Sequence, residues 1–332
     1  MSTINVTTEP ENAETERGMN GMSIDRLWSY GIWAVLLVLV VFISIVNPVF
    51  RSTTNLTDVL EQISMLGIVA AGMLVMMVSG GFDLSVGAIG ATASVAGAEL
   101  SLHGGLALAI PGAIVVGLII GLANGLLIAK GRINAFVTTF AMASIVTGIL
   151  FTATSAAPIA ANAGWLLTLA LGTIAGIPWA FIAYIIIITC TWFLLARTKL
   201  GHYIYSIGGN REASFLSGIP VVSAQVLAFV YGGLCAALAG LILLGQANIG
   251  QPSSATDWPL TAIAICVIGG VSLSGGVGRV HGVVAATLLL GVISNALSLL
   301  NISPYIQPTI TGVVIILAVV LDRVSQSRGA TG

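Results

Sequence analysis

The chain has 332 residues, of which 57% are hydrophobic and only 7% are charged, and its 11 basic and 12 acidic residues leave a net charge of −1. A soluble globular domain carries about 25% charged residues. This composition, with a mean hydropathy of +1.06, excludes an ordinary soluble fold and is typical of a protein embedded in a bilayer.

The first predicted element is a polar N-terminal tail. Residues 1–23 contain several glutamates and few large apolar residues, a composition that predicts a disordered cytoplasmic segment. No cleavable signal sequence is expected, because the tail is long and acidic and the first apolar segment has no small-x-small cleavage site. A transmembrane domain is predicted over 24–323, followed by a second cytoplasmic tail over 324–332.

The membrane domain is predicted to be an all-α bundle of about ten transmembrane helices. Ile133–Ala196 and Ala213–Thr256 contain no charged residue, and a helix needs only about 20 apolar residues to cross the hydrocarbon layer. These runs lack the period-two alternation of a membrane barrel, so helices must satisfy the backbone. The expected spans are 28–46, 62–79, 84–101, 106–128, 134–154, 179–196, 222–245, 258–270, 282–300 and 305–321.

One further apolar segment, 164–176, is too short to span and lies between Pro158 and Pro178. It is interpreted as an interfacial helix in a long loop, with a re-entrant piece as the alternative. Lysine and arginine are retained on the cytoplasmic side of a membrane. With ten spans, the basic residues of the loops and of both ends fall on one face, and only Arg51 lies opposite. Both termini are therefore expected in the cytoplasm.

Between the second and third expected spans, the run Met77–Gly87 (MVSGGFDLSVG) contains a carboxylate, Asp83, at a membrane boundary. A carboxylate there can be the N-cap of the next helix. It can also mark a segment that moves during transport, because ionisable groups at glycine-broken helices often lie on pathways. The two interpretations are compatible. The candidate pathway residues of this segment are Gly80, Gly81, Asp83, Ser85 and Gly87.

A related pattern follows the eighth expected span, where Gly-Gly-x-x-Leu-Ser recurs with Gly269, Gly270 and Ser274. Asn124 and Asn295 then stand in comparable apolar contexts downstream of the two copies. Transporters are commonly built from such repeats, so a weak internal repeat is predicted, although the first copy has an extra helix before its asparagine. Each asparagine is interpreted as an interhelical hydrogen-bonding residue, with a substrate contact as the alternative.

The longest predicted inner loop, 197–221, is the most polar part of the membrane domain. Asn210 can cap a short helix over 211–217, Gly218 can end it, and the proline at 220 prevents its continuation. The pattern predicts a short amphipathic helix on the inner membrane face that exposes Phe215 and Leu216. Such a helix can be a plain connector or a docking element for a partner.

Several chemistries have no signature in this sequence. There is no GxxxxGK[ST] phosphate loop, HExxH or GxSxG motif, and no pair of intramembrane carboxylates that would suit proton or sodium coupling. The three cysteines and three histidines lack metal-ligand spacing; they are Cys190, Cys235, Cys266, His103, His202 and His281. We therefore expect no enzyme activity, no metal and no cofactor bound by this chain, and an energy source outside it.

Several motifs resemble the ribose, xylose and arabinose class of ATP-binding-cassette importer permeases, and the resemblance covers about residues 28–323. The similar segments are Asn47-Pro48-Val49-Phe50, Asn55-Leu56, Gly72, Ser79–Gly87, Gly208–Ala213, Ser217-Gly218-Ile219 and Gly269–Gly276. Phe82 and Ser214 depart from the pattern, since many relatives carry isoleucine and alanine there.

The resemblance implies a permease subunit of the bacterial inner membrane that passes a monosaccharide into the cytoplasm. It implies partners: a second permease copy or paralogue, a cytoplasmic ATPase subunit that holds ATP and Mg, and a periplasmic or lipoprotein sugar-binding protein. No nucleic-acid partner is expected. The inner loop is similar to the ATPase-coupling segment of such permeases, which implies this role for Gly208, Gly209, Asn210, Arg211, Glu212, Ala213, Ser214 and Gly218.

Other substrates and one other class remain open at this point. Within the same superfamily, the alternatives are autoinducer-2, nucleosides and branched-chain amino acids. From a different class, the alternative is a self-sufficient secondary transporter, which the missing coupling carboxylates disfavour.

Overall fold

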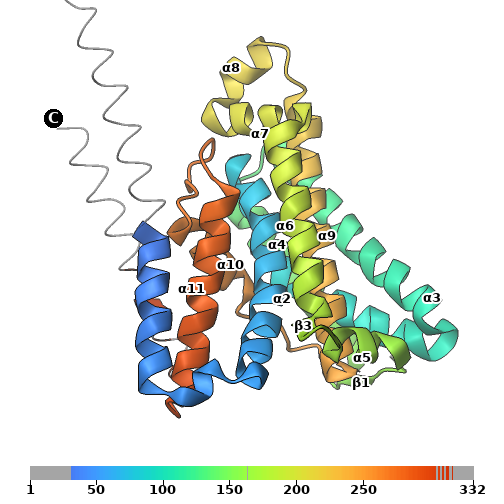
Figure 1. The fold of residues 1–332 in the computed structure, drawn as a ribbon. Helices are drawn as coiled ribbons and strands as arrows, with labels where there is room; N and C mark the ends of the chain where they lie inside the picture. The colour runs from blue at the N-terminus through green and yellow to red at the C-terminus, as the bar shows by residue number, and fades with distance from the viewer. Residues whose placement is uncertain are drawn as a thin grey trace, which may run out of the picture.

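The computed structural model describes residues 31–162 and 164–303, together with residues 306, 309, 312, 313 and 316. The described part is a bundle of helices with α7 and α8 at one end and α5 and β1 at the other (Figure 1). The two predicted tails and most of the predicted span 305–321 lie outside the described residues.

Helices make up nearly all of the described secondary structure. They are Gly31–Val46, the 3-10 turn η1 (Pro48–Arg51), α2 (Thr53–Val78), α3 (Val86–Ala129), α4 (Ala135–Thr154), α5 (Gly164–Leu171), α6 (Trp179–Arg197), α7 (Lys199–Gly209), α8 (Arg211–Leu216), α9 (Val221–Ala247), α10 (Trp258–Ile268) and α11 (Val280–Leu299). Two short antiparallel pairs join β1 (Ile159–Ala160) to β4 (Ile249–Gly250) and β2 (Thr173–Ile174) to β3 (Ile177–Pro178).

The all-α membrane architecture is confirmed, and each predicted span up to residue 300 coincides with a helical segment. Six of the described helices are long and apolar enough to cross a membrane. One of these, α3, has 44 residues and contains two non-helical positions, Gly104 and Gly105. Gly105 has φ of 59° and ψ of −157°, a conformation open essentially to glycine alone. The chain therefore breaks between the predicted spans 84–101 and 106–128.

The centre of the bundle is α2. Every residue from Gly67 to Val78 is buried, and the helix packs against α6, α9, α10 and α11. The most extensive helix contact joins α3 to α9, where Gly117 and Gly121 face Gly233 so closely that the backbones touch. Small residues permit this approach in membranes, where dispersion and not hydrophobic exclusion holds helices together.

The predicted span 258–270 is the shortest of the ten. It is the helix α10, whose 11 residues rise only about 16 Å, roughly half of the hydrocarbon thickness. Its first residue, Trp258, packs against Gly90 of α3, and Gly90 in turn packs against Gly240 of α9. Gly240 lies about 10 Å of helical rise inside the end of α9 at Ala247.

The chain that precedes α10 therefore descends into the bundle before the helix begins. This segment, 251–257, passes close to the start of α3, where a Cβ on Gly87 would overlap the carbonyl oxygen of Ala255. The helix predicted over 258–270 is confirmed as α10 to within two residues, whereas the depth at which it starts depends on these contacts and not on the apolar composition of the segment.

Two loop predictions also need correction. The segment 164–176 forms a helix only as far as Leu171, and the β2–β3 hairpin follows, with Ala175 and Gly176 at positive φ in its turn. The inner loop 197–221 contains a second helix, α7, that was not predicted. Its signal was present in the sequence, because Thr198 caps it by accepting a hydrogen bond from the amide of Gly201.

Candidate functional site

The short helix α8 stands out at its end of the bundle (Figure 1). The Asn210 side chain accepts a hydrogen bond from the amide of Ala213 at 2.9 Å. Gly218, at φ of 78°, ends the helix and donates to the carbonyl of Phe215. The capped helix predicted over 211–217 is therefore confirmed as α8. Its last two residues, Phe215 and Leu216, are 71% and 80% exposed, an unusual position for large apolar side chains.

The residues at the start of α8 differ in their exposure to solvent. Glu212 and Ala213 are exposed, as are Gly209 and Asn210 before them, whereas Ser214 is buried. The Ser214 hydroxyl donates to the carbonyl of Asn210 at 2.8 Å. The departure from alanine at this position therefore adds a bond within α8 and leaves the exposed face unchanged.

Arg211 fixes α8 to the bundle. Its guanidinium donates to the Gln225 side chain of α9 and to the carbonyl of Ala129 at the end of α3, the latter at 2.7 Å. Burial, and then the charge of Arg132, lower the pKa of Arg211, but arginine stays charged at neutral pH. Charge-assisted bonds of this kind are stronger than neutral ones. The exposed helix is thus held by one cation that spans two membrane helices.

Gln225 extends this connection to α2. It is 4% exposed, and its amide nitrogen lies 3.5 Å from the carbonyl oxygen of Ser79, the C-cap of α2. Sequence reasoning did not single out Gln225, because a single glutamine in an apolar run has no motif around it. Only the folded chain brings it between Arg211 and Ser79.

Three backbone segments meet beside this connection, and we refer to them as the glycine junction: Val78–Gly80, Gly208–Gly209 and Gly275–Gly276. The amide of Gly276 donates to the carbonyl of Val78 at 2.9 Å. A Cβ on Gly208 would overlap that same carbonyl oxygen, and a Cβ on Gly275 would lie 2.8 Å from the Cα of Gly80. The end of α2, the end of α7 and the loop after α10 therefore touch through backbone atoms.

Both glycine pairs of the predicted repeat lie at a helix end, one residue out of register: the left-handed glycine is the first of the pair after α2 and the second after α10. Gly80 and Gly270 have φ of 88° and 80°, in the left-handed region that favours glycine. After α2, the amides of Gly80 and Gly81 bond to the carbonyls of Met77 and Met76. After α10, Gly270 and Val271 bond to Val267 and Cys266 in the same pattern. Both helices thus end in a Schellman motif, with Gly269 as the C-cap of α10.

Asp83 is fully buried in the loop after α2. One carboxylate oxygen accepts from the amide and the hydroxyl of Ser85, each at 2.6 Å, and the other accepts from the Asn124 amide of α3 at 3.0 Å. Asn124 also donates to the Ser85 hydroxyl at 2.9 Å. The N-cap position of α3 is Ser85, whose side chain makes no cap bond. Asp83 lies two residues before it, and its carboxylate accepts the Ser85 amide, so the predicted contact between a carboxylate and a free amide at this helix start is present but displaced from the N-cap itself.

This Asp83–Ser85–Asn124 network is not fully paired. The Asn124 side-chain oxygen is buried and has no hydrogen-bond partner among the described residues. A buried carboxylate that accepts several bonds is stabilised as an acceptor. The structure therefore brings together three of the sequence-predicted candidates, two before and one after the break at Gly104 and Gly105 of α3.

Asn295 belongs to a different cluster. It pairs with Asn55 of α2 through two reciprocal amide bonds of 2.8 and 3.1 Å, which is the geometry of an interhelical link. Ser274 is exposed in the loop after α10, where its amide bonds to the Ser272 hydroxyl at 3.1 Å. Within the described ranges, no group of three or more histidine, cysteine or acidic side chains could hold a metal ion.

The described helices define a multi-pass membrane protein with a short, capped and exposed helix at one end. A family model described as the permease component of a branched-chain amino acid transport system matches residues 55–319. The chain belongs to this family of permeases.

Named relatives are closely similar over most of the chain. The ribose import permease protein RbsC of Haemophilus influenzae is 37% identical over 293 residues, covering 87% of this chain and 91% of the relative. The L-arabinose transport system permease protein AraH of Escherichia coli is 38% identical over 317 residues, covering 94% and 96%. No solved structure matches the chain.

Proposed function

We propose that this chain is the membrane-spanning permease subunit of an ATP-binding-cassette importer that passes a monosaccharide into the cytoplasm. A separate ATPase subunit would hold ATP and Mg and supply the energy. A periplasmic or lipoprotein sugar-binding protein would deliver the substrate, and a second permease copy or paralogue would complete the membrane unit. The observation that carries the proposal is α8, a capped and exposed helix bonded by Arg211 to two membrane helices.

The contacts of α8 support a route for mechanical coupling. A displacement of α8 by an ATPase subunit would act on Gln225 and Ala129 through Arg211, and on Ser79 through Gln225. Ser79 belongs to the glycine junction, which connects the end of α2 to the loop after α10. Alternating access requires two states with different contacts. The segments 79–87 and 269–278 are the parts that we propose to move.

The topology is part of the proposal: ten membrane-crossing segments in the bacterial inner membrane, the eighth made of α10 together with the chain 251–257 that leads down to it. Both termini and both tails, 1–23 and 324–332, would lie in the cytoplasm. The basic residues near α8 support this orientation, because Lys130, Arg132, Arg197 and Lys199 adjoin the helix ends there. The break in α3 supports counting it as two spans. The shared Schellman motifs after α2 and α10 support the internal repeat.

A monosaccharide is the proposed substrate class because the named relatives import ribose and L-arabinose. The family description names branched-chain amino acids instead, so these form the second candidate. The Asp83 network supports a system without ion coupling, because the buried carboxylate already accepts three hydrogen bonds within the protein. Two come from Ser85 and one comes from the side-chain amide of Asn124.

Reconstitution of the chain with the ATPase and binding protein encoded beside it tests the proposal. Uptake of labelled ribose or arabinose into proteoliposomes should require ATP, the ATPase and the binding protein. Replacement of Gly209 by Asp together with Glu212→Lys should abolish uptake while hydrolysis continues, because both positions lie on the exposed face of the docking element. The matched control is His202→Ala on the exposed surface of α7, which should transport normally.

Two results would contradict the proposal. Normal uptake by the Gly209 and Glu212 double variant would remove the docking role of α8. Sugar movement by the chain alone, without ATP or a partner, would favour a self-sufficient transporter. Saturable uptake of leucine in place of sugar would keep the importer class and reassign the substrate to branched-chain amino acids.

A further inference from the structure

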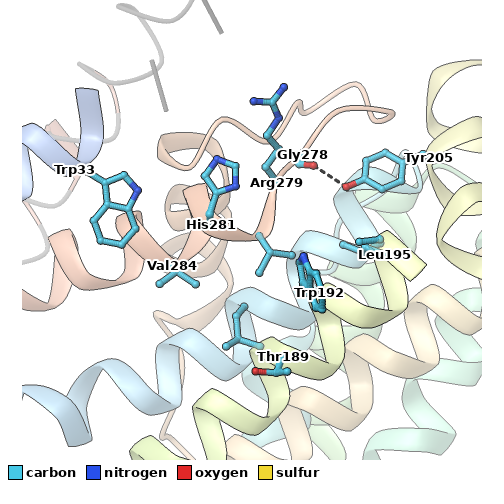
Figure 2. A pocket seen from close by; sticks show the side chains of 12 residues that line it. Trp33, Thr189, Trp192, Leu195, Tyr205, Gly278, Arg279, His281 and Val284 are labelled. Atoms are coloured by element: carbon cyan, nitrogen blue, oxygen red, sulfur yellow. Dashed lines mark hydrogen bonds between the residues drawn. The ribbon is translucent and has the colours of Figure 1, made fainter. Parts of the chain in front are cut away.

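A cavity of about 510 Å³ lies where helix Gly31–Val46, α6, α7 and α11 come together at the α8 end of the bundle. Figure 2 shows Trp33 and Val284 on one side, Trp192 and Leu195 on the other, and Arg279 and His281 at the rim. None of these residues belongs to α8, the glycine junction or the Asp83 network. The cavity is therefore a separate feature of the fold.

The walls of the cavity divide into a rim with one cation and an apolar floor. Arg279 is the cation, exposed at the start of α11, and the exposed His281 beside it supplies an imidazole that is mostly neutral at pH 7 and can donate a hydrogen bond. Outside the lining, the guanidinium of Arg197 lies 5.6 Å from the centre of the Trp192 ring. Ile188 and Val284 line the cavity further along α6 and α11. A ligand that fits this surface has an anionic end and a hydrocarbon end.

The rim is held in place by Tyr205 of α7. Its hydroxyl donates to the carbonyl of Gly278 at 2.7 Å (Figure 2). Burial raises the pKa of Tyr205, and the charge of Arg279 opposes that shift, so the phenol remains a donor at neutral pH. The backbone on which Arg279 stands is thus fixed from a second helix.

The rim carries no counter-charge within the described ranges. No acidic residue lines the cavity. The one ion pair in the described part of the chain joins His103 to Glu99, which lie away from the cavity. The N-terminus of α11 has no side-chain cap, so its dipole adds positive potential at the same place. An uncompensated cationic rim attracts an anion.

The position of the cavity selects a lipid over a soluble anion. Trp33 and Trp192 are 38% and 45% exposed, and exposed tryptophans on membrane helices mark the headgroup level. Basic pockets between membrane helices on the cytoplasmic side bind anionic headgroups. We propose that this cavity binds an anionic phospholipid, with the phosphate at Arg279 and His281 and an acyl chain along Ile188 and Val284.

The proposal rests on membrane insertion in the proposed orientation and not on coupling to ATP, so it is tested with the permease alone. Purified protein would be exchanged into nanodiscs of phosphatidylcholine containing phosphatidylglycerol, and bound lipid would be counted by native mass spectrometry. The test variant carries Arg279→Gln and His281→Gln. The matched control carries Arg51→Gln and His103→Gln, the same change of residue types at exposed positions away from the cavity.

Wild type and control should retain phosphatidylglycerol and unfold at a higher temperature in its presence than in phosphatidylcholine alone. The test variant should bind it about tenfold more weakly and lose the added thermal stability. Its unfolding temperature in pure phosphatidylcholine should match wild type, because both replaced side chains are exposed and folding does not depend on them.

Three outcomes would overturn the proposal. Equal retention of phosphatidylglycerol by the test variant and the control would remove the cavity as the site. Equal stabilisation by glycerol phosphate, which has no acyl chain, would assign the rim to a soluble anion. A gain of lipid binding on deletion of residues 1–23 would show that the acidic tail, and not lipid, occupies the cavity in the full chain.

Discussion

The carbonyl oxygen of Val78 accepts a hydrogen bond from the amide of Gly276 at 2.9 Å, although the two residues are separated by more than half of the chain. This bond joins the end of the central helix α2 to the loop after α10. Gly208 closes the contact from α7, with no room for a side chain. The segments that the sequence identifies as glycine breaks are therefore in direct contact with one another and with the element that precedes α8.

Gly208→Ala should destabilise the protein severely. The added methyl group would overlap the carbonyl of Val78 and lie close to the amide of Gly276, and neither backbone can move without breaking the junction. We expect a loss of about 3 kcal/mol or more, seen as a lower unfolding temperature and yield in detergent. Gly209→Ala is the matched control, because its Cβ meets nothing within 4 Å. Equal stability of the two variants would show that the junction is not tightly packed.

Arg211→Ala should separate hydrolysis from transport. It removes the bonds to Gln225 and to the Ala129 carbonyl, while the Asn210 cap and the exposed Phe215 are unchanged. We expect a stability loss of about 1–3 kcal/mol and a several-fold fall in sugar moved per ATP hydrolysed in reconstituted vesicles. Arg132→Ala, a nearby cation without a side-chain hydrogen bond in the described structure, is the control. A normal transport ratio in the Arg211 variant would show that α8 transmits force by another contact.

An exchange of charge between Asp83 and Asn124 tests the buried network. Asn124→Asp alone places a second carboxylate about where the amide now donates at 3.0 Å, and an uncompensated buried charge costs about 3–5 kcal/mol. The double variant Asp83→Asn and Asn124→Asp restores one carboxylate and one amide, so it should recover most of the lost thermal stability. If the double variant is no more stable than Asn124→Asp, the two residues do not form the pair seen here.

Labelling of single cysteines should separate the two faces of the membrane. In a background with Cys190, Cys235 and Cys266 replaced by serine or alanine, His103→Cys should react with an impermeant maleimide in intact cells. Ser217→Cys, beside α8, should react only after the membrane is permeabilised. Both native positions are exposed, so access to water and not burial decides the result. The opposite pattern would invert the proposed orientation.

Local signals in the sequence predicted α8 well. Its cap at Asn210 and its end at Gly218 depend on residues within a few positions of one another, and the same holds for the glycine breaks. The helix α7 was not predicted although Thr198 caps it, because only the Asn210 cap and the Gly218 end were considered in this loop. For Asp83, the sequence predicted a capping role. In the folded chain Asp83 lies two residues before the N-cap of α3, Ser85, and its carboxylate accepts hydrogen bonds from the amide and the hydroxyl of Ser85.

Long-range partners could not be predicted in the same way. Nothing near Gln225 indicates that it lies between Arg211 and Ser79, and nothing near Asn295 indicates its partner Asn55. Such contacts depend on how helices far apart in the chain pack together. The depth of α10 in the bundle has the same cause: the sequence predicts its bounds to within two residues, whereas the packing of Trp258 at Gly90 sets where in the bundle it begins.

The shortness of α10 has a consequence for how the protein is made. A helix that rises only about 16 Å exposes backbone at its ends to lipid if it enters the bilayer by itself, and unsatisfied backbone groups there cost several kcal/mol each. Stable insertion of α10 therefore has to wait for α2 and α3, which are synthesised earlier and supply the surface around Trp258. Biogenesis of this region should be coupled to assembly of the first half of the chain. A substitution at Gly90 that displaces Trp258 should therefore be seen first as a defect in the insertion of α10.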